Sequence, residues 1–386
     1  MVAKGTIAMS GLSLFFTSWA GGVCAIVVGI VLGRVLTLAV KQLIGGPSRY
    51  DRTIEFLFSG AAVALWYWEV YALQLSPLAI DGKPFIGSNT ILLLRWLSHL
   101  IFFSCLAAAT WIDLRFKIIP DWITVTGVLI GFILIGLVPD IGLPVGSIHE
   151  RSFAHPEIVP DILSMSGGLY SFPAAPWLSG YPHVTGLGVA LIIFWVWWFF
   201  CTVPCFHCHD DQHVFPSKQT LLEPRNVLLA VVAICLVIIW YLDGRRFDAI
   251  QSSMIGLFVS AGLTWGVREG ASRAMGQEAM GFGDVTLMAM IGVWLGWQPA
   301  ILVFFMAVFI GLLHGLFGLI LRRENELPYG PSLCLAAATV VVCWRFVWVL
   351  TGGFFSDPLL LVFVLGSVVL LTTISLRILR LMRGRN

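Results

Sequence analysis

The residues best suited to chemistry are aspartates at the ends of apolar segments. Asp284 lies in Met280–Met288, "MGFGDVTLM", between glycines and an apolar run, while Asp113 and Asp121 flank the loop of "DLRFKIIPD". A carboxylate near hydrocarbon is costly to ionise and tends to be functional. Two such groups at one site can share a proton, so that one activates a water and the other polarises a carbonyl. The pattern indicates a pair of acids suited to hydrolysing a peptide bond, Asp284 with an acid of the Asp113–Asp121 loop.

The composition predicts that the elements holding these aspartates are membrane helices. The chain has 386 residues, of which 58% are hydrophobic and 11% charged, and the mean hydropathy is +0.91. A water-soluble globule of this length does not carry so few charges. The net charge of +2 is too small to indicate a nucleic-acid partner. We therefore expect a lipid bilayer as the surroundings of an all-α bundle.

Eleven apolar stretches approach the length of about 20 residues that a helix needs to cross the hydrocarbon core. Because the shortest of them are marginal, we predict about 9 to 11 membrane spans. The candidate spans cover residues 11–33, 54–75, 90–112, 122–138, 186–203, 226–242, 249–267, 285–297, 299–321, 332–351 and 358–379.

The distribution of Lys and Arg predicts the orientation of the bundle, because cytoplasmic loops are enriched in these residues. With the N-terminus outside and the C-terminus in the cytoplasm, sixteen of the 23 basic residues face the cytoplasm and five face the other side. Both aspartate loops then lie at the cytoplasmic face, near the interface. Arg245 and Arg246 fit this orientation poorly, since it places them outside.

Small residues and a proline accompany the aspartates. Gly281 and Gly283 permit close approach of another backbone, and we expect a substrate to use that space beside Asp284. Pro120 can open the next helix, because its missing N–H is harmless in a first turn. Asp121 follows it as a second acidic candidate in the first motif.

These motifs resemble those of the type IV prepilin peptidases, a family of membrane aspartyl proteases. "DLRFKIIPD" is similar to their first motif, G-x-G-D to their second, and "ELPYGPSLCLAA" (Glu326 to Ala337) to a third block near their end. The resemblance covers about residues 90–140 and 260–340. It implies a multi-pass enzyme of the bacterial inner membrane that cleaves prepilin or pseudopilin leaders at the cytoplasmic face. It also implies Asp113 and Asp284 as the catalytic pair, with Asp121 outside it and no metal required.

Two features depart from the pattern of that family. The loop "KQLIGGPSRYDR" between the first two spans lacks the paired C-x-x-C zinc module of bifunctional members, which counts against methyl transfer. The two motifs are also separated by an insertion. We accordingly divide the chain into N-terminal helices (1–89), a first catalytic helix pair (90–138), the insertion (139–248), the G-x-G-D helices (249–351) and a C-terminal helix with a basic tail (352–386).

The insertion contains a cluster of Cys and His residues, "CTVPCFHCHDDQH". Cys205, Cys208, His209 and His213 could hold zinc, which accepts mixed sulfur and nitrogen ligands. The C-x-x-C-H spacing also fits covalent haem attachment, but the predicted cytoplasmic placement favours zinc over haem. A loop without metal is the remaining alternative.

Other hypotheses stay open at the level of sequence. A proton-coupled transporter would also place acids near broken helices, and an inactive assembly scaffold would retain the motifs without activity. Glu55, Glu69, Arg95 and His99 lie in or near the spans, where pairing inside the bundle is a simpler explanation than catalysis.

Overall fold

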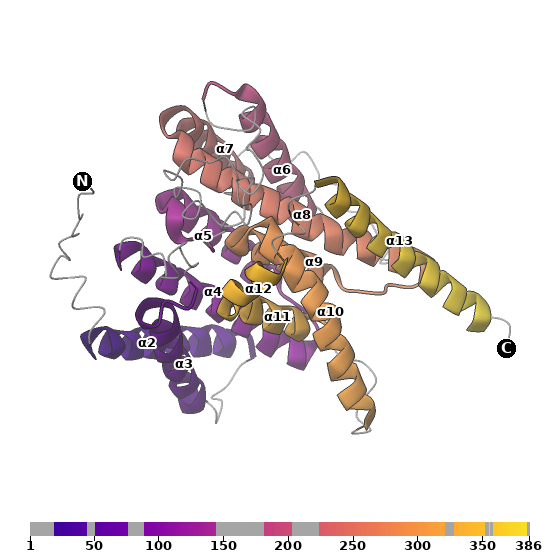
Figure 1. Cartoon of the computed structure of the whole chain (residues 1–386), viewed down its shortest axis with the longest axis horizontal. Coiled ribbons are helices and arrows are strands. Elements are labelled where there is room, and N and C mark those ends of the chain that lie inside the picture. Colours follow the sequence, from indigo (N-terminus) through magenta and orange to yellow (C-terminus); the bar gives the residue numbers. More distant parts are fainter. Residues whose placement is uncertain are drawn as a thin grey trace, which may run out of the picture.

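The computed structural model describes residues 19–44, 51–75, 89–143, 181–202, 224–320, 328–351, 355 and 358–383. These residues form helices and short connections, with no strand among them (Figure 1). In chain order the elements are α2 (Trp19–Ile44), α3 (Asp51–Trp66), the π-helical turn η1 (Tyr67–Tyr71), α4 (Asn89–Phe116), α5 (Asp121–Leu137), the 3-10 turn η2 (Pro139–Ile141), α6 (Val184–Thr202), α7 (Pro224–Leu242), α8 (Gly244–Met275), α9 (Phe282–Leu295), α10 (Trp297–Ile320), α11 (Gly330–Val342), α12 (Trp344–Thr351) and α13 (Pro358–Arg383).

The predicted all-α membrane fold is confirmed. Within the described ranges, three helices are long and apolar enough to cross a membrane, and a fourth is added if α11 and α12 form one bent span. Shorter apolar helices accompany them. Each of the eleven predicted spans overlaps a helix, whereas the total number of crossings and their orientation remain predictions.

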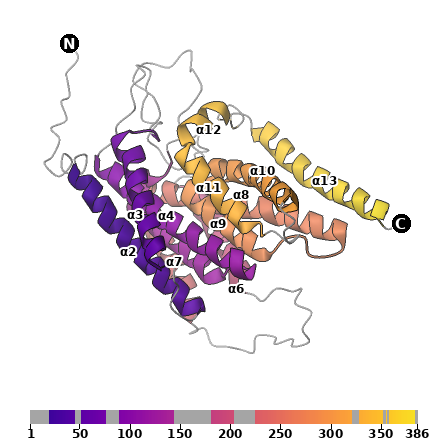
Figure 2. The same ribbon diagram turned by 90° about the horizontal axis from the view of Figure 1, so that it is seen from below.

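The helices are arranged around α9. Figures 1 and 2 show α2 and α3 at one end of the molecule, α13 at the other, and α9 between α8 and α11. Helices α5, α8, α10 and α11 all contact α9. The inserted helices α6 and α7 contact each other and α8, so they extend the bundle on the side of α8 rather than separating the two aspartate motifs.

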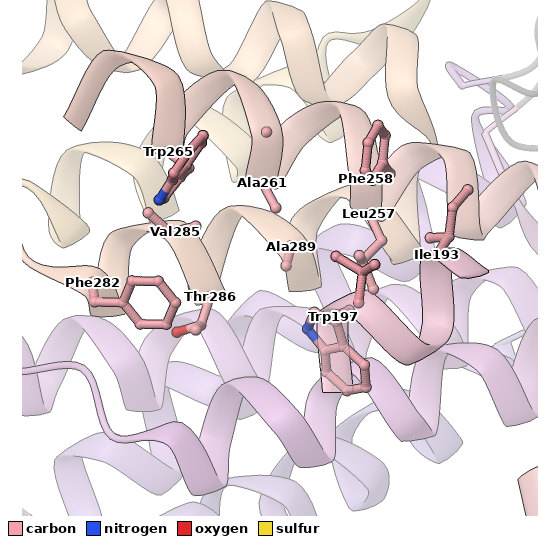
Figure 3. A pocket seen from close by; sticks show the side chains of 12 residues that line it. Ile193, Trp197, Leu257, Phe258, Ala261, Trp265, Phe282, Val285, Thr286 and Ala289 are labelled. Atoms are coloured by element: carbon pink, nitrogen blue, oxygen red, sulfur yellow. The ribbon is translucent and has the colours of Figure 1, made fainter. Parts of the chain in front are cut away.

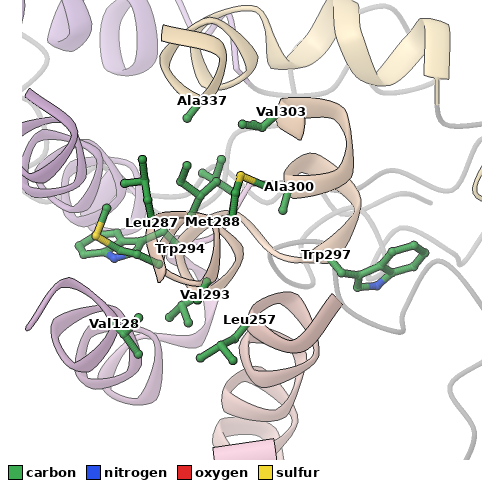
Figure 4. Packing of buried hydrophobic residues seen from close by; sticks show 14 of the residues in the cluster. Val128, Leu257, Leu287, Met288, Val293, Trp294, Trp297, Ala300, Val303 and Ala337 are labelled. Carbon is green, nitrogen blue, oxygen red and sulfur yellow. The ribbon is translucent and has the colours of Figure 1, made fainter. Parts of the chain in front are cut away.

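Helix α9 is buried on all sides. Every residue from Asp284 to Leu295 is shielded from solvent, and the apolar residues from Leu287 onward join the main core cluster. Figure 4 shows α9 with Leu287, Met288 and Trp294 directed between its neighbours, which contribute Val128 from α5 and Ala337 from α11. A helix that is apolar all round is covered by protein or by lipid, and α9 is covered by its neighbouring helices.

Helices α8 and α9 touch through their backbones. A methyl group added at Gly256 would collide with the carbonyl oxygen of Gly292, and one added at Gly292 would collide with that of Gly256. One turn along α8, the Ser260 hydroxyl donates to the Met288 carbonyl at 2.7 Å. Small residues at such spacing allow helices in lipid to pack closely, so this crossing fixes the height and rotation of α9.

A second glycine pair lets α5 approach α9 from the other side. Gly127 and Gly131 leave space for Met290, Val293 and Trp294, whose atoms occupy the positions that side chains would take. The indole of Trp294 donates to the Gly127 carbonyl at 2.9 Å. Packing and this hydrogen bond together hold α5 against the central helix.

The span predicted over residues 332–351 is bent, because α11 and α12 meet at an angle of 89°. Trp68 donates to the Val342 carbonyl at 2.9 Å, and Arg345 donates to the Leu73 carbonyl at 2.5 Å. Residues in and just after η1 thus form hydrogen bonds with residues on both sides of the bend. Hydropathy alone does not register such a break, since both halves are apolar.

Helix α8 is longer than the predicted span 249–267. Asp243 caps its start, accepting from the Arg246 N–H at 3.2 Å, and its end reaches Met275. An apolar window stops at charged residues, whereas backbone hydrogen bonding continues through them. Arg245 and Arg246, which fitted the predicted orientation poorly, lie in the first turn of α8, where Arg245 pairs with Asp140 at 2.7 Å.

An acid of η1 and a histidine of α4 form a buried pair, as the packing hypothesis predicted. His99 Nδ1 lies 2.6 Å from Glu69 Oε1, and both side chains are buried. Arg95 is also buried and donates to the Asp140 carbonyl at 2.9 Å. His99 and Asp113 are separated by about 21 Å along one helix, so this pair is separate from the aspartate motifs. The side chain of Glu55 lies outside the described residues.

Substitution at the α8–α9 crossing tests its contribution to stability. We expect Gly256→Ala to lower the free energy of unfolding by about 1–3 kcal/mol, because the added methyl group forces the two backbones apart. The measurement is denaturant or thermal unfolding of the purified protein in detergent.

Gly262→Ala, six residues further along the same helix, is the matched control. A methyl group added there meets nothing within 4 Å, so we expect unchanged or slightly higher stability. Equal stability of the two variants would contradict the close-packing interpretation.

Candidate functional site

Asp113 lies in the last turn of α4, where the chain reverses. Its residue is only 5% exposed. The Lys117 N–H donates to the Asp113 carbonyl at 2.9 Å, and Lys117 has a left-handed φ of 54°, which ends the helix. The turn directs Ile118 and Ile119 back across the end of the bundle, toward Pro120 and the start of α5.

Asp284 lies in the first turn of α9 and is 8% exposed. Gly281 precedes the helix with extended backbone angles, and its carbonyl accepts from the Asp284 N–H at 3.3 Å. A carboxyl group in the first turn of a helix lies near unpaired N–H groups and the positive end of the helix dipole. These groups stabilise the negative charge of a buried carboxylate at the start of an otherwise apolar helix.

The start of α11 completes the site. The Gly330 N–H donates to the Asp113 carboxyl, and a methyl group at Gly330 would collide with Asp113 Oδ2. The preceding residue, Tyr329, lies near Asp284: burial raises the pKa of its phenol, and the nearby negative charge of Asp284 raises that pKa further. The Tyr329 hydroxyl is buried and has no hydrogen-bond partner in the described part of the chain.

The fold therefore brings the two predicted aspartates together. The carboxyl groups of Asp113 and Asp284 are close enough for their charges to interact, and both also act on the thiol of Cys334 one turn into α11. Three stretches that are far apart in sequence thus meet at one end of the bundle, with two buried carboxyl groups between them. Such a pair cannot readily hold two negative charges.

The glycines of the G-x-G-D motif have different surroundings. At Gly283, which lies inside α9, the space is filled by Ile119, whose Cβ would be 2.9 Å from an added methyl carbon. We expected this space for a substrate, but the structure uses it to pack the first motif onto the second. At Gly281, by contrast, the nearest atom beyond its neighbours is Asp284 Oδ2, at 4.0 Å, so the open approach to that carboxyl is there.

The remaining acid of the first motif has a different environment. Asp121 is the first residue of α5 and is exposed, and Pro120 precedes it with extended backbone angles. An acid in the first turn stabilises a helix through the dipole. Its exposure separates Asp121 from the buried pair, although it belongs to the same loop.

One arrangement at the site was missed from the sequence. Arg268 of α8 donates to the Met280 carbonyl at 2.9 Å and to Glu278 Oε1 at 2.5 Å, and its guanidinium lies 5.9 Å from the centre of the Phe282 ring. Ser272 accepts from the Ala279 N–H at 3.1 Å. The end of α8 thus holds the loop that carries Asp284. In the sequence Arg268 is only one of the basic residues that predict orientation, since its partners lie 10 to 14 residues away.

The predicted zinc ligands Cys205, Cys208, His209 and His213 lie outside the described residues, as does most of the external loop before α6. Within the described ranges, no group of three or more His, Cys, Asp and Glu residues is arranged to hold a metal ion. The metal hypothesis therefore stays a prediction.

Fold and site together define a multi-pass helical membrane protein with two buried, interacting carboxyl groups at helix ends. Residues 218–316 match the sequence model of the type IV leader peptidase family. This matched segment runs from just before α7 into α10 and includes Asp284. Asp113 lies outside the match and joins the site through the fold.

Similar curated proteins carry the name prepilin leader peptidase/N-methyltransferase. The protein of Aeromonas salmonicida (strain A449) is 37% identical over 93 residues, which is 23% of this chain and 30% of that protein. The protein of Dichelobacter nodosus is 28% identical over 158 residues, which is 40% of this chain and 49% of that protein. The chain thus spans less than half the length of either relative. No solved structure matches it.

Removal of the Arg268 side chain tests how the Asp284 loop is held. We expect Arg268→Ala to speed hydrogen exchange of the amides of residues 277–283 by about tenfold or more, because hydrogen bonds to charged groups contribute about 1.5–3 kcal/mol. The measurement is hydrogen exchange followed by mass spectrometry.

Arg273→Ala provides the comparison, since this side chain is 75% exposed and forms an ion pair with Glu269 of its own helix. It should leave the exchange of the loop unchanged. An Arg268→Ala protein with the exchange pattern of the unaltered chain would show that the loop is held by other contacts.

Proposed function

We propose that this protein is a membrane-embedded aspartic endopeptidase that removes leader peptides from prepilin- or pseudopilin-like precursors. The observation that carries the proposal is the burial of Asp113 beside Asp284, contributed by helices on either side of an insertion. The family match and the names of the similar proteins support a processing protease.

In the proposed mechanism the two carboxyl groups share one proton. The ionised member removes a proton from a water as its oxygen attacks the peptide carbonyl, and the protonated member donates a hydrogen bond to the carbonyl oxygen. Collapse of the tetrahedral intermediate then breaks the C–N bond as the amine receives a proton. Cleavage by this route needs no metal. The Gly330 N–H orients Asp113, and Gly281 leaves the approach to Asp284 open.

The proposed location is the bacterial inner membrane, with the site facing the cytoplasm. Support comes from the distribution of Lys and Arg and from the position of both carboxyl groups at helix ends. At a helix end near the interface, water can reach the reacting groups, whereas at the centre of the bilayer it cannot. The proton-coupled transporter considered above would instead place its acids near the midplane.

Isosteric substitutions test the catalytic pair. We expect Asp113→Asn and Asp284→Asn each to reduce leader removal by at least about 100-fold, because neither amide can transfer the required proton. The measurement is processing of a co-expressed prepilin, read as the mass of the mature N-terminus.

Asp121→Asn should retain most of the activity, since this exposed residue does not contact the pair in the proposed mechanism. All three variants must be shown to insert in the membrane. Normal processing by Asp113→Asn or Asp284→Asn would refute the catalytic assignment, and loss of activity only in Asp121→Asn would point to the other acid of the first motif.

For the Cys/His cluster of the insertion we propose a zinc site with a structural role, formed by Cys205, Cys208, His209 and His213. Tetrahedral zinc with sulfur and nitrogen ligands stabilises small loops. The absence of cysteine from residues 41–52 counts against the methyl transfer named in the relatives. We therefore expect an unmethylated N-terminus in the processing experiment above.

Metal analysis of the purified protein tests this site. We expect about one zinc per chain, lost in Cys205→Ser and Cys208→Ser because each removes a thiolate ligand. Cys235→Ser is the control, since Cys235 is an exposed free cysteine on α7. A chain without stoichiometric metal, or with haem in its absorption spectrum, would contradict the zinc assignment.

A further inference from the structure

Tyr329 carries a polar group for which the fold supplies no partner. Its hydroxyl oxygen is buried, yet it makes no hydrogen bond within the described part of the chain. An unpaired buried hydroxyl destabilises a folded protein, and phenylalanine would provide the same ring without that cost. The hydroxyl is therefore available to a polar group that enters the site from outside the chain.

The backbone around Tyr329 places this residue at the pair of carboxyl groups. Tyr329 precedes α11, and its carbonyl accepts from the Ser332 N–H at 3.0 Å. The next residue, Gly330, is packed so closely against Asp113 that an added methyl group would collide with the carboxyl oxygen Oδ2. The negative charge of Asp284 also acts on the phenol. Tyr329 is thus near both acids, on the side of the site that α11 forms.

The ring of Tyr329 is held in place by α10. Its Cε2 and Cδ2 atoms lie 3.5 and 3.6 Å from the position that a methyl carbon at Gly311 would occupy. The ring also packs against the main core cluster. Because the ring is fixed by these contacts, its hydroxyl stays in one place and needs little reorganisation when a substrate arrives.

The electrostatic environment determines what the hydroxyl can do. Burial raises the pKa of the Tyr329 phenol above its usual value, and the nearby charge of Asp284 raises that pKa further. The hydroxyl therefore keeps its proton at neutral pH, which excludes it as the base that activates water. It can still donate a hydrogen bond.

We propose that the Tyr329 hydroxyl donates a hydrogen bond to the carbonyl oxygen of the peptide bond that is cleaved. This inference rests on the proposed function and adds a catalytic residue to the two aspartates. When the water oxygen bonds to the carbonyl carbon, the π electron pair of the C=O bond moves to the carbonyl oxygen, and the water proton passes to the ionised carboxyl group. The phenol stabilises the charge on that oxygen while it keeps its own proton. This charge is lost when the C=O bond re-forms and the C–N bond breaks.

Removal of the hydroxyl oxygen tests the proposal. Tyr329→Phe keeps the ring against Gly311, so we expect an unchanged or slightly higher unfolding temperature. We expect kcat for leader removal from a purified prepilin in proteoliposomes to fall about 100-fold while KM stays within about twofold, because the hydrogen bond strengthens as the charge develops. Replacement of Tyr329 by 3-fluorotyrosine retains the donor and should keep kcat within about threefold of the unaltered protein.

Tyr67→Phe is the matched control. Tyr67 is 53% exposed in η1, and the next residue, Trp68, donates to Val342 at the end of α11 opposite Tyr329. This variant should process the prepilin with unchanged kcat and KM.

An unchanged kcat in Tyr329→Phe, an equal loss in Tyr67→Phe or in the 3-fluorotyrosine protein, or a loss confined to KM would overturn the proposal. A lowered unfolding temperature of Tyr329→Phe would assign the hydroxyl a structural role and overturn it too. So would a shifted pH profile of kcat with an unchanged maximum, because the hydroxyl would then act on Asp284 and not on the substrate. Failure of the unaltered protein to process the prepilin would instead refute the proposed function itself.

Discussion

Where α8 and α9 cross, Gly256 and Gly292 leave no room for even a methyl group, and the two backbones touch. Contact this close fixes the translation and rotation of α9, because any shift of either helix creates either a collision or a gap. The hydroxyl of Ser260 bonds the same crossing to the backbone of α9. Asp284 is carried at the start of this helix, so its position follows from the packing one to two turns below it.

Three chain reversals complete the site at the same end of the bundle. Lys117 ends α4 just after Asp113. The loop between α8 and Asp284 is fixed by the hydrogen bond from Arg268 to Met280. At the start of α11, the Gly330 N–H donates to the Asp113 carboxyl. Each reversal is local, yet burying two carboxyl groups together requires all three. Because the three segments pack tightly around the carboxyl groups, Ile119 fills the space beside Gly283, and Asp113 fills the space beside Gly330.

The insertion is compatible with this site because its helices pack on the outside of α8. Helices α6 and α7 contact α8 and each other, while α5 and α9 contact one another directly. If both helices cross the membrane, as the sequence predicts, the chain returns to the side from which it left. In this position α6 also lines an apolar pocket together with α8 and α9 (Figure 3).

The apolar runs and the types of residue at their ends are local properties, and these determined the helical membrane fold, the approximate helices and the choice of Asp113 and Asp284 as a pair. Other features depend on partners distant in sequence. The bend between α11 and α12 depends on Trp68 and Arg345, the packing role of Gly283 on Ile119, and the support of the Asp284 loop on Arg268. No periodicity or spacing encodes those contacts, because each arises only when separate helices are packed against one another. The tertiary structure alone decided them, together with the proximity of the two carboxyl groups.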